Sequence, residues 1–261
     1  VEWSLRLISL LGLYGMLFFT NRIIRILFQK DGSLFLILGA ATQVYFVRMG
    51  ILVMTDTLCG MFIMGTFYFY VKTIVEKKNT AVYWMLLFAL FAFFSRYASI
   101  PIIILPVCHA SFVTVRKWKP FVQLLVLIGG LTGIVGIVLL NNRVFDEIFL
   151  LMNEWDMRTV FSRSYNNREK FDSHWVPNIL YAFGNFLHIG FLSLGVFLLP
   201  FYRKIEKPNA VILISALVYI LFIAGLSIQN YRFLVITHPL ILIVLFPAFE
   251  GLKNWLVSKK I

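Results

Sequence analysis

The sequence predicts an all-α membrane protein, a polytopic bundle of about nine transmembrane helices. Apolar residues make up 60% of the 261 positions and charged residues only 14%, with a mean hydropathy of +0.86. A soluble domain has about 45–50% apolar and about 25% charged residues. The chain also divides into apolar stretches near the roughly 20 residues that an α-helix needs to cross a bilayer. These observations exclude a soluble globule, a disordered chain and a disulfide-stapled secreted domain.

Nine apolar stretches are separated by polar segments. The apolar region from Ala81 to Val115 is too long for one ordinary span, and Ser95-Arg96 is its only polar break. We therefore expect two helices there. The predicted spans are, in order, Leu5–Leu27, Leu34–Val47, Thr57–Val75, Ala81–Phe94, Ser99–Val115, Phe121–Leu140, Asn178–Tyr202, Ala210–Ser227 and Phe233–Phe249.

The charges support a topology with Val1 outside and the C-terminus in the cytoplasm. The cytoplasmic segments then hold 15 of the 24 basic residues and four acidic ones, a net charge of +11, whereas the outer segments have a net charge of +1. Short cytoplasmic loops of membrane proteins carry an excess of Lys and Arg. The total of +12 is thus explained by membrane orientation, and we expect no nucleic-acid partner. These segments are 21–33, 72–80, 116–120, 203–209 and 250–261.

Polar residues at the predicted outer membrane edge indicate a functional site. Charges at that depth are costly and mark function. The planar guanidinium of Arg suits a phosphate group, so these arginines favour a phosphorylated lipid headgroup. Snorkelling anchors with one Arg48–Asp56 ion pair are the alternative. The edge residues are Arg48, Asp56, Arg96, Tyr97, Tyr231 and Arg232.

The outer segment Asn141–Pro177 is the longest polar stretch of the chain. Loops of this length are often functional where other loops are short. Its middle, Phe145–Phe161, has the pattern of an amphipathic helix lying on the membrane. His174, beside Trp175, belongs to no metal-ligand spacing, and the chain contains no Walker loop, G-x-G-x-x-G motif or nucleophile elbow.

Four segments carry short motifs whose order is informative. Residues 3–9 have the pattern W-x-x-R-L-x-S, and residues 44–62 have an Arg followed eight positions later by an Asp and then an apolar span. Residues 86–106 contain Ser-Arg-Tyr before a proline-bearing span, and residues 229–246 contain Tyr-Arg-Phe-Leu before a proline. Together they resemble, in the same order, the polytopic type C glycosyltransferases of family 39, the protein O-mannosyltransferases and bacterial lipid A aminoarabinose transferases. That family has Thr-Lys-Tyr in the third motif.

The resemblance implies a helix bundle with its active site at the outer edge. It implies an enzyme that moves a sugar from a polyprenyl- or dolichyl-phosphate carrier to an extracytoplasmic acceptor, which is a lipid, a glycan or a protein. The carrier phosphate would be held by Arg48, Arg96 and Arg232.

Further roles follow from the same resemblance. Asp56 would be the second family acid and would orient these arginines or the acceptor. No certain cofactor is implied beyond the lipid-phosphate sugar that serves as donor, and a divalent metal ion is a further candidate. Contacts to the acceptor or carrier are assigned to Tyr97, His174 and Tyr231.

The family's main acidic motif follows its first span, and this sequence begins after that point. We therefore expect 1–261 to be a single transmembrane domain that lacks the first span and the catalytic acid. The chain is then a fragment, the membrane partner of a second subunit, or inactive. A transporter or flippase and a non-catalytic subunit are the alternatives from other classes. Clustering of charges at one face, without related halves, favours the enzyme. The expected location is a bacterial inner membrane, with the endoplasmic reticulum as the alternative.

Overall fold

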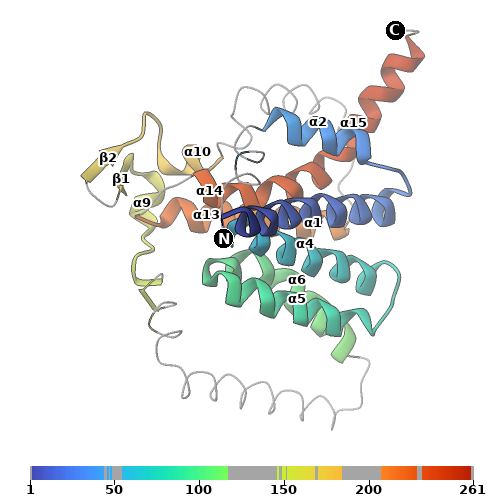
Figure 1. Ribbon diagram of the computed structural model, residues 1–261, viewed down its shortest axis with the longest axis horizontal. Coiled ribbons are helices and arrows are strands. Elements are labelled where there is room, and N and C mark those ends of the chain that lie inside the picture. Colours follow the sequence, from blue (N-terminus) through green and yellow to red (C-terminus); the bar gives the residue numbers. More distant parts are fainter. Residues whose placement is uncertain are drawn as a thin grey trace.

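The computed structural model describes part of the chain, and every structural statement below concerns that part. It comprises residues 2–43, 46, 48, 55–116, 146, 149, 150, 152–167, 170–183, 207–227 and 231–259. The fold is all-α, as predicted, with one small β-hairpin (Figure 1). Its long helices are α1 (Glu2–Phe28), α2 (Ser33–Thr42), α4 (Thr55–Ile74), α5 (Ala81–Ser95), α6 (Ile100–Val115), α13 (Lys207–Gly225) and α15 (His238–Ser258).

Helices α1 and α4 pack side by side and run in the same direction. Gly12 of α1 faces the backbone of Thr57, and Met16, one turn further along α1, faces Gly60 of α4. A Cβ atom on Gly12 would lie 2.7 Å from the Thr57 carbonyl carbon. Glycine at this position therefore lets the two backbones approach closely, as small residues do between membrane helices.

Because α1 and α4 run in the same direction, the chain must cross the bundle once between them. The sequence predicts that residues 34–47 form this crossing span. The structure places α2 there, but this helix ends at Thr42 after ten residues. Ten helical residues span about 15 Å, half the hydrocarbon thickness of a bilayer. The second predicted span is therefore helical for only part of its expected length within the described residues.

The break between α5 and α6 lies where the sequence predicts it. Helix α5 ends at Ser95, and Arg96 takes an extended backbone conformation with φ −165° and ψ 115°. A 3₁₀ turn, η1 (Tyr97–Ser99), then leads into α6, which has Pro101 in its first turn. Proline fits this position because the first helical N–H groups have no intrahelical partner. The turn sets α5 and α6 side by side (Figure 1).

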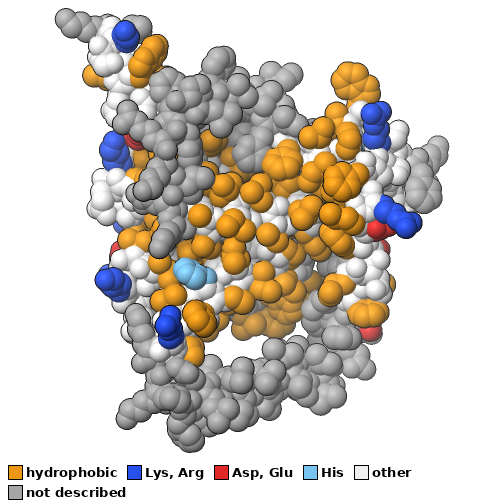
Figure 2. Space-filling model, turned by 180° about the vertical axis from the view of Figure 1, so that it is seen from behind, with side chains coloured by type: hydrophobic (Ala, Val, Ile, Leu, Met, Phe, Trp, Pro, Cys, Tyr) orange, Lys and Arg blue, Asp and Glu red, His pale blue; other side chains and the backbone are white. Residues whose placement is uncertain are grey.

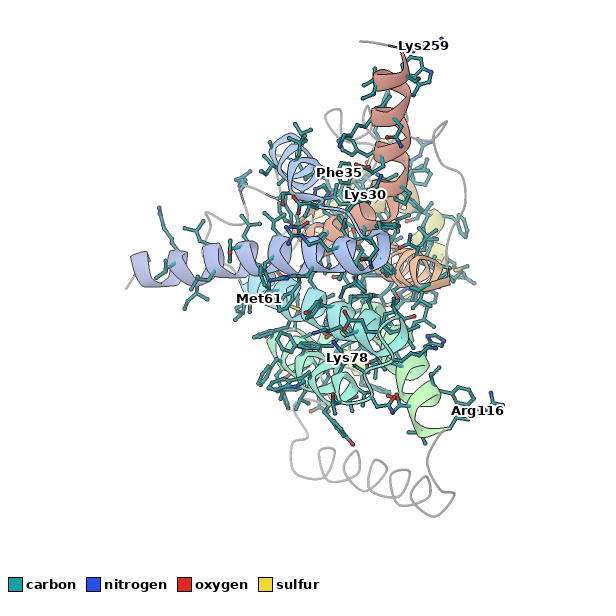
Figure 3. The ribbon with its side chains drawn as sticks, turned by 90° about the vertical axis from the view of Figure 1, so that its right-hand side faces the viewer. Lys30, Phe35, Met61, Lys78, Arg116 and Lys259 are labelled. Atoms are coloured by element: carbon teal, nitrogen blue, oxygen red, sulfur yellow. The ribbon has the colours of Figure 1, made fainter. Side chains whose placement is uncertain are left out.

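The bundle has two chemically different ends. Basic residues gather at the end where α1, α4 and α15 finish, which we call the basic end; Figure 3 looks onto the molecule from that side. There Lys30 after α1 pairs with Glu250 of α15, with 2.5 Å between Nζ and Oε2. The opposite end, where α4, α6 and α15 begin, we call the outer end. Four basic residues of the basic end are labelled in Figure 3: Lys30, Lys78, Arg116 and Lys259.

Large apolar side chains cover much of the surface between these ends. Figure 2 shows them across the middle of one face, with basic side chains toward its edges. An exposed apolar surface of this extent marks an interaction with another phase or partner, and here it fits the hydrocarbon of a membrane. On α5 alone these side chains are Tyr83, Trp84, Leu86, Leu87, Leu90, Phe91 and Phe94.

Within the described residues, five helices are long and apolar enough to cross a bilayer. The predicted total of nine stays a prediction, since the span over 121–140 lies outside the described residues. Of the predicted span Asn178–Tyr202, only the start is described. It forms a five-residue helix, α10 (Asn178–Ala182), followed by a turn at Phe183.

Candidate active site

Asp56 and Arg96 form an ion pair at the outer end. Asp56 lies in the first turn of α4, where the partial positive charge of a helix N-terminus favours a carboxylate. Its Oδ1 contacts Nη1 of Arg96, and the two side chains are only 6% and 20% exposed. The pair therefore couples the start of α4 to the turn between α5 and α6.

The Arg96 guanidinium also packs over an aromatic ring. Its central carbon lies 4.4 Å from the ring centroid of Phe233, in helix α14 (Tyr231–Leu234). A guanidinium over an aromatic face gains a cation–π attraction and keeps its N–H donors directed sideways. The Arg96 guanidinium is thus held by the Asp56 carboxylate and by the Phe233 ring.

Two buried hydroxyl groups lie near the pair. Ser99 donates its backbone N–H to the Arg96 carbonyl oxygen at 3.0 Å, and its side chain is fully buried. Tyr219 of α13 is also fully buried and lies within electrostatic range of Arg96. Neither hydroxyl has a hydrogen-bond partner within the described ranges. These groups add hydrogen-bonding capacity beside the cation.

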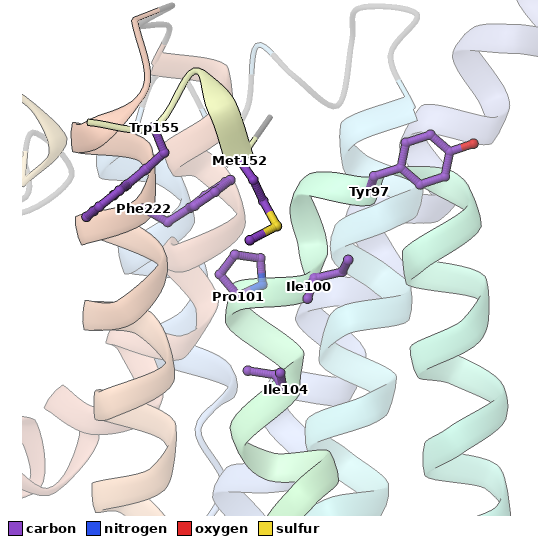
Figure 4. Close-up of a pocket in the computed structure, with 7 residues that line it drawn as sticks. All are labelled: Tyr97, Ile100, Pro101, Ile104, Met152, Trp155 and Phe222. Carbon is purple, nitrogen blue, oxygen red and sulfur yellow. The ribbon is translucent and has the colours of Figure 1, made fainter. Parts of the chain in front are cut away.

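An apolar pocket of about 360 Å³ opens beside this cluster (Figure 4). It lies between α6 and α13, and residues Met152 and Trp155 of the outer segment cover its upper edge. Tyr97, which follows Arg96, lines the same pocket, although its ring points away from the other side chains and toward Phe93. Arg96 itself does not line the pocket, and it is connected to the cavity through the adjacent residue Tyr97.

The outer segment is folded and docks on the end of α13. The backbone N–H of Asp156 donates to the Gly225 carbonyl oxygen at 3.0 Å, and Trp155 pairs with Leu226 in an isolated β-bridge. A Cβ atom on Gly225 would lie 2.1 Å from Nε1 of Trp155. Glycine at that position is therefore what allows the indole to reach the pocket.

Asn178 holds the outer segment together. Its buried side chain donates to the carbonyl oxygens of Thr159 and Ser164, at 2.9 and 3.0 Å. These contacts join α10 to helix α9 (Met157–Phe161) and to strand β1 (Ser164–Asn167), which pairs antiparallel with β2 (Lys170–Ser173). The prediction of one amphipathic helix over 145–161 is wrong at Trp155-Asp156, because Trp155 pairs with Leu226 and Asp156 caps α9.

His174 lies in this outer segment, apart from the ion pair. Its ring is stacked between Tyr165 and Tyr181, at centroid distances of 4.0 and 3.7 Å. Partial burial lowers the pKa of His174 below 6.5, although the nearby Asp172 carboxylate acts in the opposite direction. The histidine is therefore neutral at pH 7, and the neighbouring Trp175 projects outward, 95% exposed.

The structure brings together some of the predicted site residues. Asp56, Arg96 and Tyr97 meet at the outer end, whereas Arg48 is exposed and, within the described residues, forms no ion pair. The Arg48–Asp56 ion pair of the alternative interpretation is not formed within the described residues, where Asp56 pairs with Arg96 instead. The side chains of Tyr231 and Arg232 lie outside the described set, although their helix α14 supplies Phe233 to the cluster.

The sequence interpretation missed Phe233, Tyr219 and Trp155. A polar-tipped tyrosine inside the apolar stretch 210–227 was the available signal for Tyr219. No local signal marks Trp155, whose partner Gly225 is seventy positions away. Among the described residues, no group of three His, Cys, Asp or Glu side chains could hold a metal ion. A divalent metal stays a prediction without assigned ligands.

Comparison with known proteins assigns the chain to a family. Residues 1–140 match the family model PMT_2, described as dolichyl-phosphate-mannose-protein mannosyltransferase. No curated protein and no solved structure matches the chain. The matched region contains both members of the Asp56–Arg96 pair and more than half of the sequence. The chain therefore belongs to the PMT_2 family and is a multi-pass membrane protein of a glycosyltransferase family.

Proposed function

We propose that this protein transfers a sugar from a polyprenyl-phosphate carrier to an acceptor at the outer, extracytoplasmic end of the bundle. The observation that carries the proposal is the Asp56–Arg96 pair, whose Arg96 directly precedes Tyr97, a residue that lines the apolar pocket. A polyprenyl phosphate has an anionic group joined to a long apolar chain. The cation and the cavity provide a complementary surface for these two parts.

Arg96 would stabilise the departing phosphate. In a direct displacement, an acceptor oxygen bonds to the anomeric carbon of the sugar while the bond between that carbon and the phosphate oxygen breaks. Negative charge then grows on the phosphate, where a preorganised cation lowers the barrier. The acceptor proton passes to a base, which we assign to no residue of this chain. Asp56 serves as a positioning residue, because its ion pair fixes the Arg96 guanidinium at the outer end.

The outer segment would complete the carrier site. Trp155 and Met152 bring apolar surface over the pocket, opposite Pro101 of α6. Closing the pocket from above excludes water from the part nearest the cation, which strengthens electrostatic interactions there. The carrier's first isoprene units would lie between α6 and α13.

Sugar–phosphate bond cleavage tests this proposal directly. The protein is reconstituted in liposomes with lipid-linked sugars extracted from its source cells, and with membranes that supply the acceptor. Free polyprenyl phosphate is then measured by mass spectrometry. Wild type should release it, and Arg96→Lys should release it about tenfold more slowly because lysine lacks the planar fork. Arg116→Gln, which removes a charge at the basic end, should match wild type.

Two outcomes would overturn the proposal. If wild type and Arg96→Lys release polyprenyl phosphate at the same rate, Arg96 does not have the assigned role. Movement of the intact lipid-linked sugar across the bilayer, without bond cleavage, would instead show a flippase.

A further inference from the structure

A second groove, which shares no lining residue with the pocket, lies between α1 and α2 near the basic end. It has a volume of about 430 Å³. Its apolar walls include Tyr14 and Phe18 of α1 and Ile37 of α2, which are 69%, 41% and 64% exposed. Arg22 and Arg25 line the same groove further along α1. Nothing in the proposed transfer reaction uses it.

The groove matches one membrane leaflet in depth. Tyr14 and Arg25 are eleven residues apart on a continuous helix, which corresponds to about 16 Å. That distance is about half the 30 Å hydrocarbon thickness of a bilayer. The arginines therefore lie at headgroup depth when Tyr14 lies near the membrane midplane. Polar and apolar walls are stacked in the same order as the headgroup and acyl chains of a phospholipid.

A hydrogen-bonded turn shapes the polar end of the groove. Arg25 donates to Asp31 Oδ1 from Nε and Nη2, at 3.0 and 2.7 Å. Asn21 and Ser33 donate to the same oxygen, at 3.1 and 3.0 Å. These hydrogen bonds, that of Arg25 foremost, lower the pKa of Asp31 to about 2. Asp31 is thus ionised at neutral pH and keeps Arg25 engaged.

Arg22 differs from Arg25 in its partners. Its guanidinium carbon lies 5.2 Å from the Phe18 ring centroid, and no carboxylate of the described residues pairs with it. Arg22, Arg25 and Asp31 together leave one positive charge at this end of the groove. A ligand with a single negative charge would neutralise it.

We propose that the groove between α1 and α2 binds one anionic phospholipid of the leaflet at the basic end, with its phosphate at Arg22. One acyl chain lies along Phe18, Tyr14 and Ile37. The Arg25–Asp31 turn fixes the spacing of α1 and α2 and so sets the width of the groove. Basic pockets between membrane helices on the cytoplasmic side are known to suit such headgroups.

Native mass spectrometry tests this proposal. The purified protein is equilibrated in detergent with equal amounts of phosphatidylglycerol and phosphatidylcholine of matched acyl chains. Wild type should retain one phosphatidylglycerol in preference to phosphatidylcholine. Arg22→Gln should lower that preference roughly fivefold, the factor expected for one basic residue at an anionic headgroup. Arg116→Gln, an exposed arginine at the same end, should leave it unchanged.

Two further variants and a soluble competitor distinguish binding in this groove from binding elsewhere on the protein. Ile37→Trp should reduce retention of phosphatidylglycerol by filling the apolar part, and soluble glycerol phosphate should not displace the lipid. The charge-neutral double variant Asp56→Asn, Arg96→Gln should retain phosphatidylglycerol as wild type does. The proposal is overturned if wild type shows no preference, or if Arg22→Gln and Arg116→Gln lower it equally. Displacement by glycerol phosphate would show an anion site without a lipid.

Discussion

Asp56 and Arg96, forty positions apart in the sequence, form an ion pair with side chains only 6% and 20% exposed. The pair fastens the start of α4 to the turn between α5 and α6. Asp56→Asn should destabilise the protein by about 3 kcal/mol, because it leaves a buried cation without its carboxylate partner. The double variant Asp56→Asn, Arg96→Gln should recover most of that loss. Unfolding in detergent, followed by circular dichroism, measures both.

The exposed Arg25–Asp31 ion pair is the control for the predicted effect of Asp56→Asn on stability. Its side chains are 50% and 54% exposed, and water and salt screen exposed pairs strongly. Asp31→Asn should therefore cost much less stability than Asp56→Asn. Equal losses for the two substitutions would contradict the structural role given to the buried pair.

The sequence predicts the helices better than it predicts their partners. The break at Ser95-Arg96 follows from local information, because two polar residues interrupt a long apolar run. The Asp56–Arg96 pair depends instead on how α4, α5 and α6 pack. Arg48 is closer to Asp56 in the sequence, yet Asp56 pairs with Arg96.

The outer segment shows the same limit. Its apolar pattern over 145–161 predicts one helix, yet the chain leaves the helix at Trp155-Asp156. The cause lies about seventy residues away, where the end of α13 offers backbone groups for pairing. Local periodicity contains no information about such a partner.

The close contact of α1 and α4 predicts different costs for two neighbouring glycines. A Cβ atom on Gly12 would meet the Thr57 backbone at 2.7 Å, whereas one on Gly15 would meet the side chain of Met61 at 2.4 Å. Backbone cannot give way as a flexible methionine can. Gly12→Ala should therefore cost about 2 kcal/mol or more, and Gly15→Ala clearly less. Unfolding midpoints in detergent compare the two, and a larger loss for Gly15→Ala would be inconsistent with this packing.

Gly225 should control the docking of the outer segment. Gly225→Ala places a methyl group against the Trp155 indole, which must then move. Tryptic cleavage at Arg158 and Arg163 should become faster, because the segment is held less firmly. Adding Trp155→Phe to Gly225→Ala should restore part of the protection, since the smaller ring leaves room for the methyl group. Unchanged cleavage in Gly225→Ala would show that this contact does not hold the segment.

His174 should make the outer segment sensitive to pH. The pKa of His174 in the folded protein lies below its ordinary value of 6.5. Below pH 6.5, the unfolded segment therefore binds protons more readily than the folded segment does. The contribution of His174 to stability is therefore complete above pH 6.5 and is lost as the pH falls from there through the lowered pKa. Hydrogen exchange of residues 164–167 and 170–182, corrected for intrinsic rates, should rise between pH 7 and pH 5.

The matched control for this effect is His174→Phe, which keeps a ring between Tyr165 and Tyr181 but cannot be protonated. Its corrected exchange should not change over the same pH range. The Asp172 carboxylate raises the pKa of His174, so Asp172→Asn should move the midpoint to lower pH without abolishing the effect. An equal pH response in His174→Phe would assign the sensitivity to another group.

Binding of undecaprenyl phosphate tests whether the Asp56–Arg96 pair holds the carrier phosphate, because this probe carries the phosphate and the isoprenoid chain without any sugar. Native mass spectrometry compares wild type, the charge-neutral double variant Asp56→Asn, Arg96→Gln, and Arg116→Gln. The double variant should bind at least about tenfold more weakly, as expected for loss of a charge-assisted contact, while Arg116→Gln should bind as wild type does. Equal binding by the wild type and the folded double variant would contradict it.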